Sequence, residues 1–280
     1  MWEVELDEPE GLIAGPSGVD PVAGILVLSG SSGRVERGRV RLLAQHGVVA
    51  LSLRWFGDVG QSPGICEVPL EGFSPAIDRL ATYVDFLAVL GVSKGAEAAL
   101  LLGTRDPRLS VVIACSPTSV VWANLGAGTD GVSRPLRSSW TAGGKSLPFV
   151  PYDDHFAVPT SAGLPAYRTL YERSLEAFAP RVPDASIPVE RISGDVIAVG
   201  GGDDLVWPSV RFAQEIADRR AAHGLTTTVL TEAGAGHRFV LPGETPLSSG
   251  VTMAYGGSPS ADAALGQRVW AAMERALHFG

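Results

Sequence analysis

Cysteines, charged side chains and long hydrophobic runs are all scarce in this sequence. Cys66 and Cys115 are the two cysteines among 280 residues, and neither has metal-ligand spacing. A disulfide framework is therefore excluded, and a reducing, cytoplasmic compartment is expected. Charged residues make up 19% and hydrophobic residues 45% of the chain, which excludes an ordinary disordered protein. No apolar run approaches the roughly 18 residues of a membrane-spanning helix, so no membrane span is expected.

Basic side chains are also in deficit. The chain has 22 Lys and Arg against 30 Asp and Glu, which gives a formal net charge of −8. This balance argues against binding to nucleic acid or to an anionic membrane surface, because both reward clustered Lys and Arg. The first residues, MWEVELDEPE, lack the basic and apolar parts of a signal peptide. No metal or cofactor is predicted, and the sequence does not indicate an oligomeric state.

Short apolar runs and segments with helical spacing alternate along the chain. Strands are predicted at 25–28, 48–53, 86–90, 111–115, 196–199 and 226–230, and helices at 34–45, 75–83, 94–102, 165–179, 208–223 and 262–278. This alternation predicts the α/β class, with a mostly parallel sheet and helices on both faces. We expect one domain over 1–280, with an insertion or cap over roughly 118–190. Its glycine- and proline-rich part, 124–165, is either functional or a plain disordered loop.

The most specific motif is Gly91-Val92-Ser93-Lys94-Gly95, which matches the pattern G-x-S-x-G. It follows a predicted strand and opens a predicted helix, which is the context of a nucleophile elbow. The nucleophile of such an elbow lies in a strained turn with small neighbours, and the helix N-terminus favours developing negative charge. The motif therefore predicts Ser93 as a nucleophile. An ordinary glycine-rich turn between strand and helix is the alternative.

A serine nucleophile needs a general base and an acid that orients the base. His46, His223 and His278 lie at or near predicted helix ends, and His155 lies in the irregular segment. His237 instead follows the last predicted strand in a glycine-rich loop. That position is the carboxyl edge of the sheet, where α/β proteins build their sites. His237 is therefore the candidate base.

Two adjacent carboxylates are candidates for the acid. Asp203 and Asp204 follow the strand at 196–199, between Ser93 and His237, as the chain order of this architecture requires. The spacing within the loop favours Asp204, and Asp203 stays open as the alternative. Asp204 would fix the tautomer of His237 and stabilise its protonated form.

The oxyanion hole is predicted to combine two backbone N–H groups. One belongs to Lys94, directly after the nucleophile, and the other to the small-residue loop after the first predicted strand. Within this loop Ser31 is the first choice and Ser32 the second. A flexible turn that opens the next helix is the alternative for the loop.

Apolar side chains in the irregular segment predict a wall of the substrate pocket. The candidates for substrate binding are Trp140, Phe149 and Phe156. Apolar side chains on an irregular segment are expected to pack against another apolar surface. A bound acyl chain would be stabilised by about 25 cal/mol for each Å² of apolar surface that it buries there. Packing on the sheet edge is the alternative.

Several stretches resemble the acyl-CoA thioesterases related to bile acid-CoA:amino acid N-acyltransferase. Residues 91–97 (GVSKGAE) resemble the nucleophile motif of that family, 203–209 (DDLVWPS) its acid loop, and 235–242 (AGHRFVLP) its histidine loop. The loop and helix over 30–44 and the tail over 255–280 are similar too. The likeness covers most of the chain.

The resemblance implies an α/β-hydrolase fold, cleavage of an acyl thioester, and a catalytic triad of Ser93, Asp204 and His237. The amino-acid transferases of the family use cysteine as nucleophile and its hydrolases use serine, so Ser93 implies hydrolysis. The implied partner is a small acyl thioester, carried by coenzyme A or by an acyl-carrier protein. Larger members carry an N-terminal β-sandwich, and no such domain is expected in this chain.

Other functions stay open. The same triad would serve an esterase, a lactonase or an amide hydrolase of the dienelactone-hydrolase type. Acyl transfer to an amine would need water kept away from the acyl-enzyme. A non-catalytic relative would lack a member of the triad, and all three are present. Five basic residues are candidates either for contacts with coenzyme A phosphates or for solvated surface: Arg39, Lys94, Arg134, Arg137 and Lys145.

Overall fold

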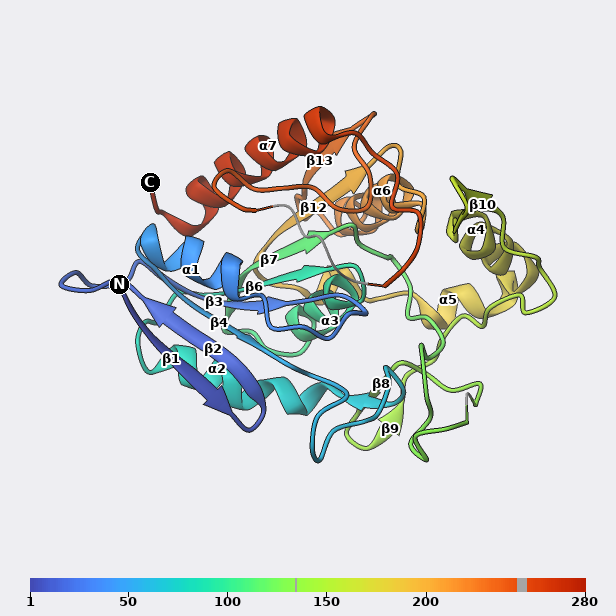
Figure 1. The fold of residues 1–280 in the computed structure, drawn as a ribbon, viewed down its shortest axis with the longest axis horizontal. Coiled ribbons are helices and arrows are strands. Elements are labelled where there is room, and N and C mark those ends of the chain that lie inside the picture. The colour runs from blue at the N-terminus through green and yellow to red at the C-terminus, as the bar shows by residue number, and fades with distance from the viewer. Residues whose placement is uncertain (134, 246–250) are drawn as a thin grey trace.

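The computed structural model describes residues 1–133, 135–245 and 251–280, and its centre is a sheet of eight strands (Figure 1). The strand order is β1-β2-β4-β3-β6-β7-β12-β13, and every pairing from β4 to β13 is parallel. The parallel strands are β3 (Ala23–Leu28), β4 (Val48–Leu53), β6 (Leu87–Val92), β7 (Leu109–Cys115), β12 (Asp195–Gly201) and β13 (Thr228–Glu232). Each overlaps one of the predicted strands, and the predicted α/β class is confirmed.

An antiparallel hairpin, not expected from the sequence, forms one edge of the sheet. β1 (Trp2–Asp7) pairs with β2 (Glu10–Gly15), and β2 pairs antiparallel with β4. Within β1 the apolar residues Trp2, Val4 and Leu6 alternate with acidic residues. This period of two is typical of a strand with one covered face.

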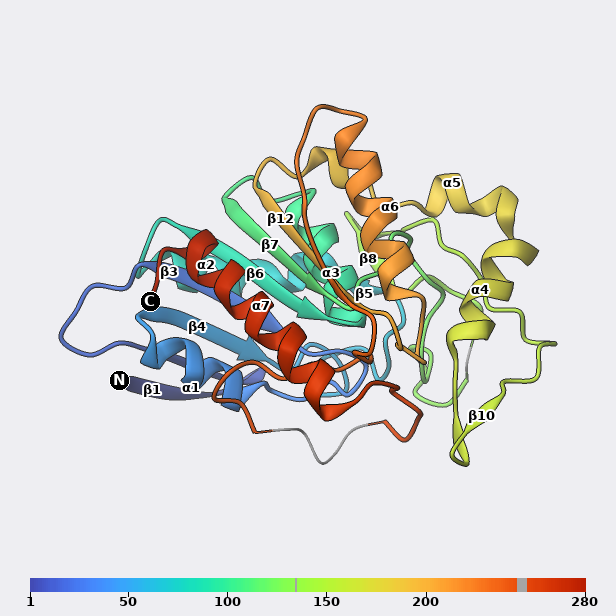
Figure 2. The same ribbon diagram turned by 90° about the horizontal axis from the view of Figure 1, so that it is seen from above.

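Helices cover both faces of the sheet (Figure 2). α1 (Arg37–Gln45) and α7 (Pro259–Leu277) share one apolar cluster with side chains of the central strands. α2 (Ser74–Ala81), α3 (Lys94–Gly103) and α6 (Ser209–Ala221) contribute to a second cluster on the opposite face. Because both faces are covered, the central strands are continuous apolar runs rather than alternating ones. Within the part of the chain that the structure describes, no helix is both long enough and apolar enough to cross a membrane.

The chain between β7 and β12 lies beyond the carboxyl ends of the parallel strands (Figure 1). It contains β8 (Trp140–Ala142), β9 (Lys145–Ser146), β10 (Thr160–Ser161), β11 (Leu164–Pro165), α4 (Arg168–Ala177), α5 (Val182–Ala185) and two 3-10 turns, η2 (Ala179–Arg181) and η3 (Val189–Arg191). β8 also pairs with β5 (Val68–Pro69), which precedes the 3-10 turn η1 (Leu70–Phe73). We call residues 116–194 the inserted segment. It has its own apolar cluster, which includes Trp122 and Tyr171 and reaches Trp207 beside the acid loop.

Candidate active site

Ser93 lies at the turn between β6 and α3. Its backbone has φ 58° and ψ −120°, a conformation that residues other than glycine rarely adopt. Its N–H donates to the carbonyl of Cys115 at 2.9 Å, and its own carbonyl accepts from the N–H groups of Ala96 and Glu97. These bonds hold Ser93 at the N-terminus of α3, where the helix dipole favours negative charge.

The two glycines of the motif allow β6, α3 and β3 to approach closely. A Cβ at Gly91 would lie 1.9 Å from the carbonyl oxygen of Gly95. A Cβ at Gly95 would lie 2.4 Å from the carbonyl oxygen of Ser29, in the loop after β3. Any side chain at either position would push the elbow apart, which is the physical reason for small residues on both sides of Ser93.

Asp204 and His237 form a buried hydrogen-bonded pair. Nδ1 of His237 lies 2.8 Å from Oδ2 of Asp204, and the side chains are 4% and 0% exposed. Oδ1 of Asp204 accepts from the N–H groups of Val206 at 2.8 Å and Trp207 at 3.1 Å. A carboxylate held in this way accepts a hydrogen bond from Nδ1–H of His237, which leaves Nε2 available to take up a proton.

Backbone bonds join the loops of the acid and the base. The carbonyl of Tyr255 accepts from the N–H of His237 at 2.8 Å and from the N–H of Leu205 at 3.4 Å. The hydroxyl of Ser116 donates to the carbonyl of His237 at 2.8 Å. Three segments far apart in sequence therefore hold His237 in place.

Ser93 and His237 line one cavity. Among the hydrogen bonds of the described residues, none joins these two side chains directly. Catalytic hydrogen bonds are often long in unliganded enzymes and shorten when substrate binds. The two predicted members of the triad therefore share a cavity without a direct bond between their side chains.

Asp203, the alternative acid, faces elsewhere. Its Oδ2 accepts from the N–H of Gly257 at 2.8 Å, in an exposed position. The structure thus brings Asp204, and not Asp203, to His237. The carboxylate of Asp203 holds the segment after Tyr255 in place.

The loop after β3 lies against the nucleophile. A Cβ at Gly30 would lie 3.0 Å from Cβ of Ser93, and Gly30, Ser31 and Ser32 line the cavity together with Ser93. The N–H of Lys94 belongs to the first turn of α3, where N–H groups have no partner inside the helix. Both predicted sources of oxyanion donors therefore adjoin Ser93.

The cavity at Ser93 is small and contains arginines that sequence reasoning missed. Its volume is about 40 Å³, and Arg34, Arg238 and Tyr255 are among its lining residues. The sequence signal for Arg238 is its place directly after His237. Arg34 follows the proposed oxyanion loop directly, so its position in sequence is a signal as well.

The side chain of Lys94 is buried in an ion pair. Its Nζ lies 2.6 Å from Oε2 of Glu97, and the two side chains are 1% and 0% exposed. Oε1 of Glu97 accepts from the N–H of Trp122 at 3.1 Å and from Nε1 of Trp140 at 2.8 Å. Burial lowers the pKa of Lys94 and raises the pKa of Glu97. The negative charge of Glu97 opposes the shift at Lys94, and the positive charge of Lys94 opposes the shift at Glu97. The pair joins the first turn of α3 to the inserted segment.

The residues predicted to bind substrate lie away from the cavity of Ser93. Trp140 is fully buried in a core cluster that also contains side chains of α3, and it stacks on Trp55 with 5.2 Å between ring centroids. Phe149 is half-buried at the margin of the same cluster, and Phe156 is half-buried in the inserted segment. None of the three lines that cavity. Their placement favours packing, which was the alternative interpretation.

The basic residues considered for coenzyme A phosphates are differently placed. Arg39 is buried and its Nε lies 2.5 Å from Oε1 of Glu244, so like Lys94 it already has a partner. Arg137 and Lys145 are exposed, and Arg137 lies 3.9 Å from Glu67. Arg134 lies outside the described residues. Over 1–133, 135–245 and 251–280, no group of three or more His, Cys, Asp or Glu is arranged to hold a metal ion.

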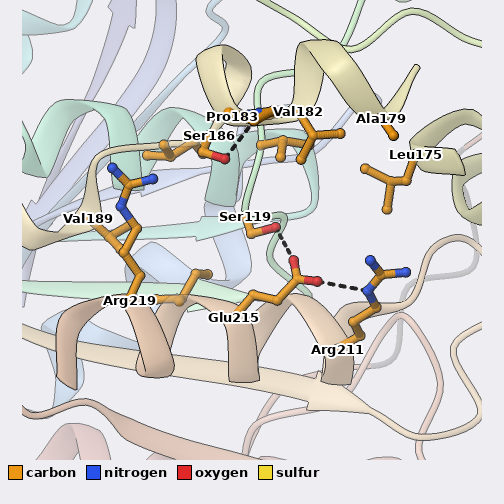
Figure 3. A pocket seen from close by; sticks show the side chains of 13 residues that line it. Ser119, Leu175, Ala179, Val182, Pro183, Ser186, Val189, Arg211, Glu215 and Arg219 are labelled. Carbon is orange, nitrogen blue, oxygen red and sulfur yellow. Dashed lines mark hydrogen bonds and ion pairs between the residues drawn. The ribbon is translucent and has the colours of Figure 1, made fainter. Parts of the chain in front are cut away.

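Two larger cavities lie apart from this site. One of about 420 Å³ is lined by residues of α5 and α6, and in it Glu215 accepts from Ser119 at 2.5 Å and from Arg211 at 2.7 Å (Figure 3). Another of about 570 Å³ is lined by residues that include Trp55 and Phe73. Ser93, Asp204 and His237 line neither. Of these three cavities, which described residues line, the small one is lined by both Ser93 and His237.

Comparison with known proteins identifies similar chains. The family described as BAAT / Acyl-CoA thioester hydrolase C terminal matches residues 68–278. The chain is 26% identical over 282 residues to acyl-coenzyme A amino acid N-acyltransferase 2 of Rattus norvegicus, covering 95% of this chain and 63% of that protein. It is 24% identical over 275 residues to the mitochondrial acyl-coenzyme A thioesterase 2 of Mus musculus, covering 92% and 55%. The chain thus spans less than two thirds of the length of both relatives.

Solved structures share the fold. A protein of Klebsiella pneumoniae described as a dienelactone hydrolase superposes with a TM-score of 0.57 at 14% sequence identity, covering 99% of this chain and 98% of that one. This likeness shows the α/β-hydrolase fold.

Proposed function

The chain belongs to the BAAT / Acyl-CoA thioester hydrolase C-terminal family, and on that premise we propose that it hydrolyses an acyl thioester of coenzyme A. Ser93 is the proposed nucleophile, His237 the general base and Asp204 the acid that orients it. The observation that carries the proposal is a single cavity that joins Ser93, in its strained elbow, to the buried pair of His237 and Asp204.

This geometry supports acylation of Ser93 as the first step. Oγ of Ser93 attacks the thioester carbonyl while Nε2 of His237 takes the hydroxyl proton, and Asp204 stabilises the resulting imidazolium. The N–H of Lys94 and an N–H of the loop at Ser31 and Ser32 stabilise the oxyanion, at about 3 kcal/mol for each donor. The thiol of coenzyme A then leaves with the proton from His237.

Hydrolysis completes the cycle. His237 removes a proton from water, which attacks the acyl-enzyme, and Ser93 recovers its proton as the acid departs. Thiols leave more readily than alcohols, so this triad is suited to thioesters and also competent for oxygen esters. A serine rather than a cysteine at the nucleophile supports water, rather than an amine, as the acceptor.

A substrate panel tests the proposal. Acyl-CoA thioesters and oxygen esters of matched acyl length are compared by kcat/KM, and the thioesters are expected to react faster. Ser93→Ala should lower kcat by about 10⁴-fold or more, because the triad acts as a unit. Ser17→Ala, at an exposed serine of the β2–β3 loop, is the matched control and should leave kcat unchanged.

A fluorophosphonate probe tests the nucleophile independently of the substrate. Intact-mass spectra should show one adduct, and peptide mapping should place it at Ser93. An adduct of unchanged yield in Ser93→Ala would exclude Ser93 as the nucleophile. Faster turnover of oxygen esters would instead identify an esterase, and formation of acyl-glycine in the presence of glycine would identify a transferase.

A further inference from the structure

Ser116, the first residue of the inserted segment, is bonded to the strand β12, the acid loop and the histidine loop. Its N–H donates to the carbonyl of Val199 in β12 at 2.7 Å, and its hydroxyl donates to the carbonyl of His237 at 2.8 Å. Its own carbonyl accepts from the indole N–H of Trp207 at 3.0 Å. The hydroxyl and both backbone polar groups of Ser116 are therefore engaged, each with a different segment of the fold.

The backbone of Ser116 is strained, and the residue is buried. Its φ is 46°, in the left-handed region that residues other than glycine seldom adopt, and it is 1% exposed. Such strain persists only where the surrounding structure imposes it, and it is concentrated at functional sites. The carbonyl of Cys115, directly before Ser116, accepts from the N–H of Ser93 at 2.9 Å. Two consecutive residues therefore bond to the backbones of the proposed nucleophile and the proposed base.

Trp207 joins this set of contacts from the acid loop. Its backbone N–H donates to Oδ1 of Asp204 at 3.1 Å. Its ring lies against the imidazole of His237, with 5.6 Å between ring centroids and an interplanar angle of 74°. The indole N–H is the group that bonds to Ser116. A buried ring with contacts on several sides cannot rotate freely, so Trp207 restrains both members of the pair formed by Asp204 and His237.

The inserted segment packs against Trp207. The ring of Tyr171, on α4, lies 5.4 Å from the ring of Trp207, and both belong to one buried apolar cluster. Among the described residues that line the cavity of Ser93, none comes from 116–194. The inserted segment thus contacts the candidate triad through Ser116 and through its packing on Trp207, and not through that cavity.

We propose that Ser116 and Trp207 are positioning residues, which hold His237 at the separation and orientation from Ser93 that proton transfer requires. A general base acts only within hydrogen-bond reach of the proton that it removes, and a displacement of about 1 Å can slow a reaction by about 100-fold. Neither residue is among the described residues that line the cavity, so both act through His237 and not on the substrate. This inference rests on the catalytic roles of Ser93 and His237 in the proposed function.

The rate at which the fluorophosphonate probe labels Ser93 measures the effect without an acyl thioester. Ser116→Gly removes the hydroxyl and should slow labelling by about tenfold to a hundredfold. Its melting temperature should stay close to that of the wild-type protein, because glycine relieves the strain at φ 46° and this offsets the lost hydrogen bond. Ser116→Ala removes the same hydroxyl but keeps the strain, and it should slow labelling to the same degree. Wild-type labelling rates in both variants would overturn the role of Ser116.

A second pair of variants tests the indole of Trp207. Trp207→Phe keeps an aromatic ring and removes the N–H that bonds to Ser116, and it should slow labelling by about tenfold. Trp122→Phe is the matched control, because Trp122 is buried in the same cluster and its indole N–H donates to the hydroxyl of Thr118 at 2.8 Å. Both variants should lower the melting temperature, but Trp122→Phe should keep the wild-type labelling rate. Equal slowing in the two variants would assign the effect to loosening of the cluster and overturn the role of Trp207.

A variant without the base separates positioning from general damage to the fold. In a His237→Ala background there is no imidazole to position, so Ser116→Gly and Trp207→Phe should cause no further loss of labelling rate. Residues that act as a unit are not additive in this way, whereas independent effects on the fold would add. A further loss of similar size in the His237→Ala background would overturn the inference.

Turnover of an acyl-CoA distinguishes failure of this inference from failure of the proposed function. In Ser116→Gly and Trp207→Phe, kcat should fall as the labelling rate does, whereas KM should change by less than about threefold. If the wild-type protein cleaves no thioester but labelling responds as expected, the proposed substrate is wrong and the positioning roles stand. If thioesters are cleaved and the labelling rates of both variants equal that of the wild-type protein, the positioning roles are wrong and the thioesterase function stands.

Discussion

Replacing Glu97 by glutamine is expected to lower the free energy of unfolding by about 3–5 kcal/mol, because it leaves the ammonium group of Lys94 buried without a counter-charge. Glutamine keeps an oxygen in place of Oε1, so the bonds from Trp122 and Trp140 can persist. The substitution therefore removes the charge and replaces Oε2, the acceptor of the hydrogen bond from Nζ of Lys94, with an amide NH2 group.

The distance between the charges sets the magnitude. At 2.6 Å and an effective dielectric constant of about 20, the attraction between Nζ of Lys94 and Oε2 of Glu97 is about 6 kcal/mol. Part of this loss is recovered, because burial lowers the pKa of Lys94 and a neutral amine is easier to bury. The remaining loss of unfolding free energy is close to the value of about 3–5 kcal/mol that is measured when one partner of a buried ion pair is removed.

Denaturation in urea measures the effect, and a surface pair provides the control. Arg173 and Glu176 on α4 have the same i, i+3 spacing but side chains that are 54% and 70% exposed. Glu176→Gln should cost at most about 0.5 kcal/mol. The double variant Lys94→Met/Glu97→Gln should recover most of the stability lost in Glu97→Gln, because no charge is then left unpaired.

The pH dependence gives a second test. In Glu97→Gln the pKa of Lys94 remains below its usual value of 10.5, so the unfolded chain binds more protons than the folded one. The loss of stability caused by Glu97→Gln should therefore become smaller as the pH rises towards 10.5. The reasoning would be refuted if Glu97→Gln lowered the free energy of unfolding by less than about 1 kcal/mol. It would also be refuted if the loss in the double variant equalled the sum of the losses in the two single variants.

Two further outcomes are expected. Asp204→Asn should lower kcat by about 10⁴-fold with the fold intact, because an amide favours the wrong tautomer of His237. Asp203→Asn should lower kcat by less than about tenfold. If steady-state kinetics give the reverse order, the acid is Asp203. Burial raises the pKa of the Cys115 thiol from 9.0 to about 12, so its contribution to stability is complete below pH 9 and is lost as the pH rises towards 12. Native Cys115 should resist alkylation at about pH 8 and react after unfolding, and peptide mapping that finds it labelled in the native state would contradict this environment.

The candidate triad could be found in the sequence because each member occupies a position defined by local structure. Ser93 stands between two glycines at the end of a strand, and the elbow geometry admits few other residues there. Asp204 and His237 each follow a strand, and the parallel order brings those strand ends to the same edge of the sheet.

Other features depend on neighbours that no local pattern specifies. The sequence allows Lys94 a place on the solvated surface, but its side chain is buried in an ion pair with Glu97, one helical turn later. Glu97 in turn accepts hydrogen bonds from Trp122 and Trp140, which are distant in sequence. Arg34 and Arg238 are ordinary charges in the sequence and meet only when the first and last parts of the chain pack together. The hairpin at 2–15, by contrast, had a local signal in the alternation of β1, which the acidic composition of that segment obscured.

The carbonyl of Tyr255, which accepts from both His237 and Leu205, also has a consequence for the order of events during biosynthesis. A growing chain that has left the ribosome as far as α6 already contains the nucleophile and the acid, but it has neither the base nor this carbonyl. The helix α7, which packs against β12 and β13, is made later still. Because domains fold as units once their contacts are available, a partly synthesised chain has the elbow without the candidate base, and the proposed hydrolytic activity would arise only after the segment with His237 and Tyr255 has been made.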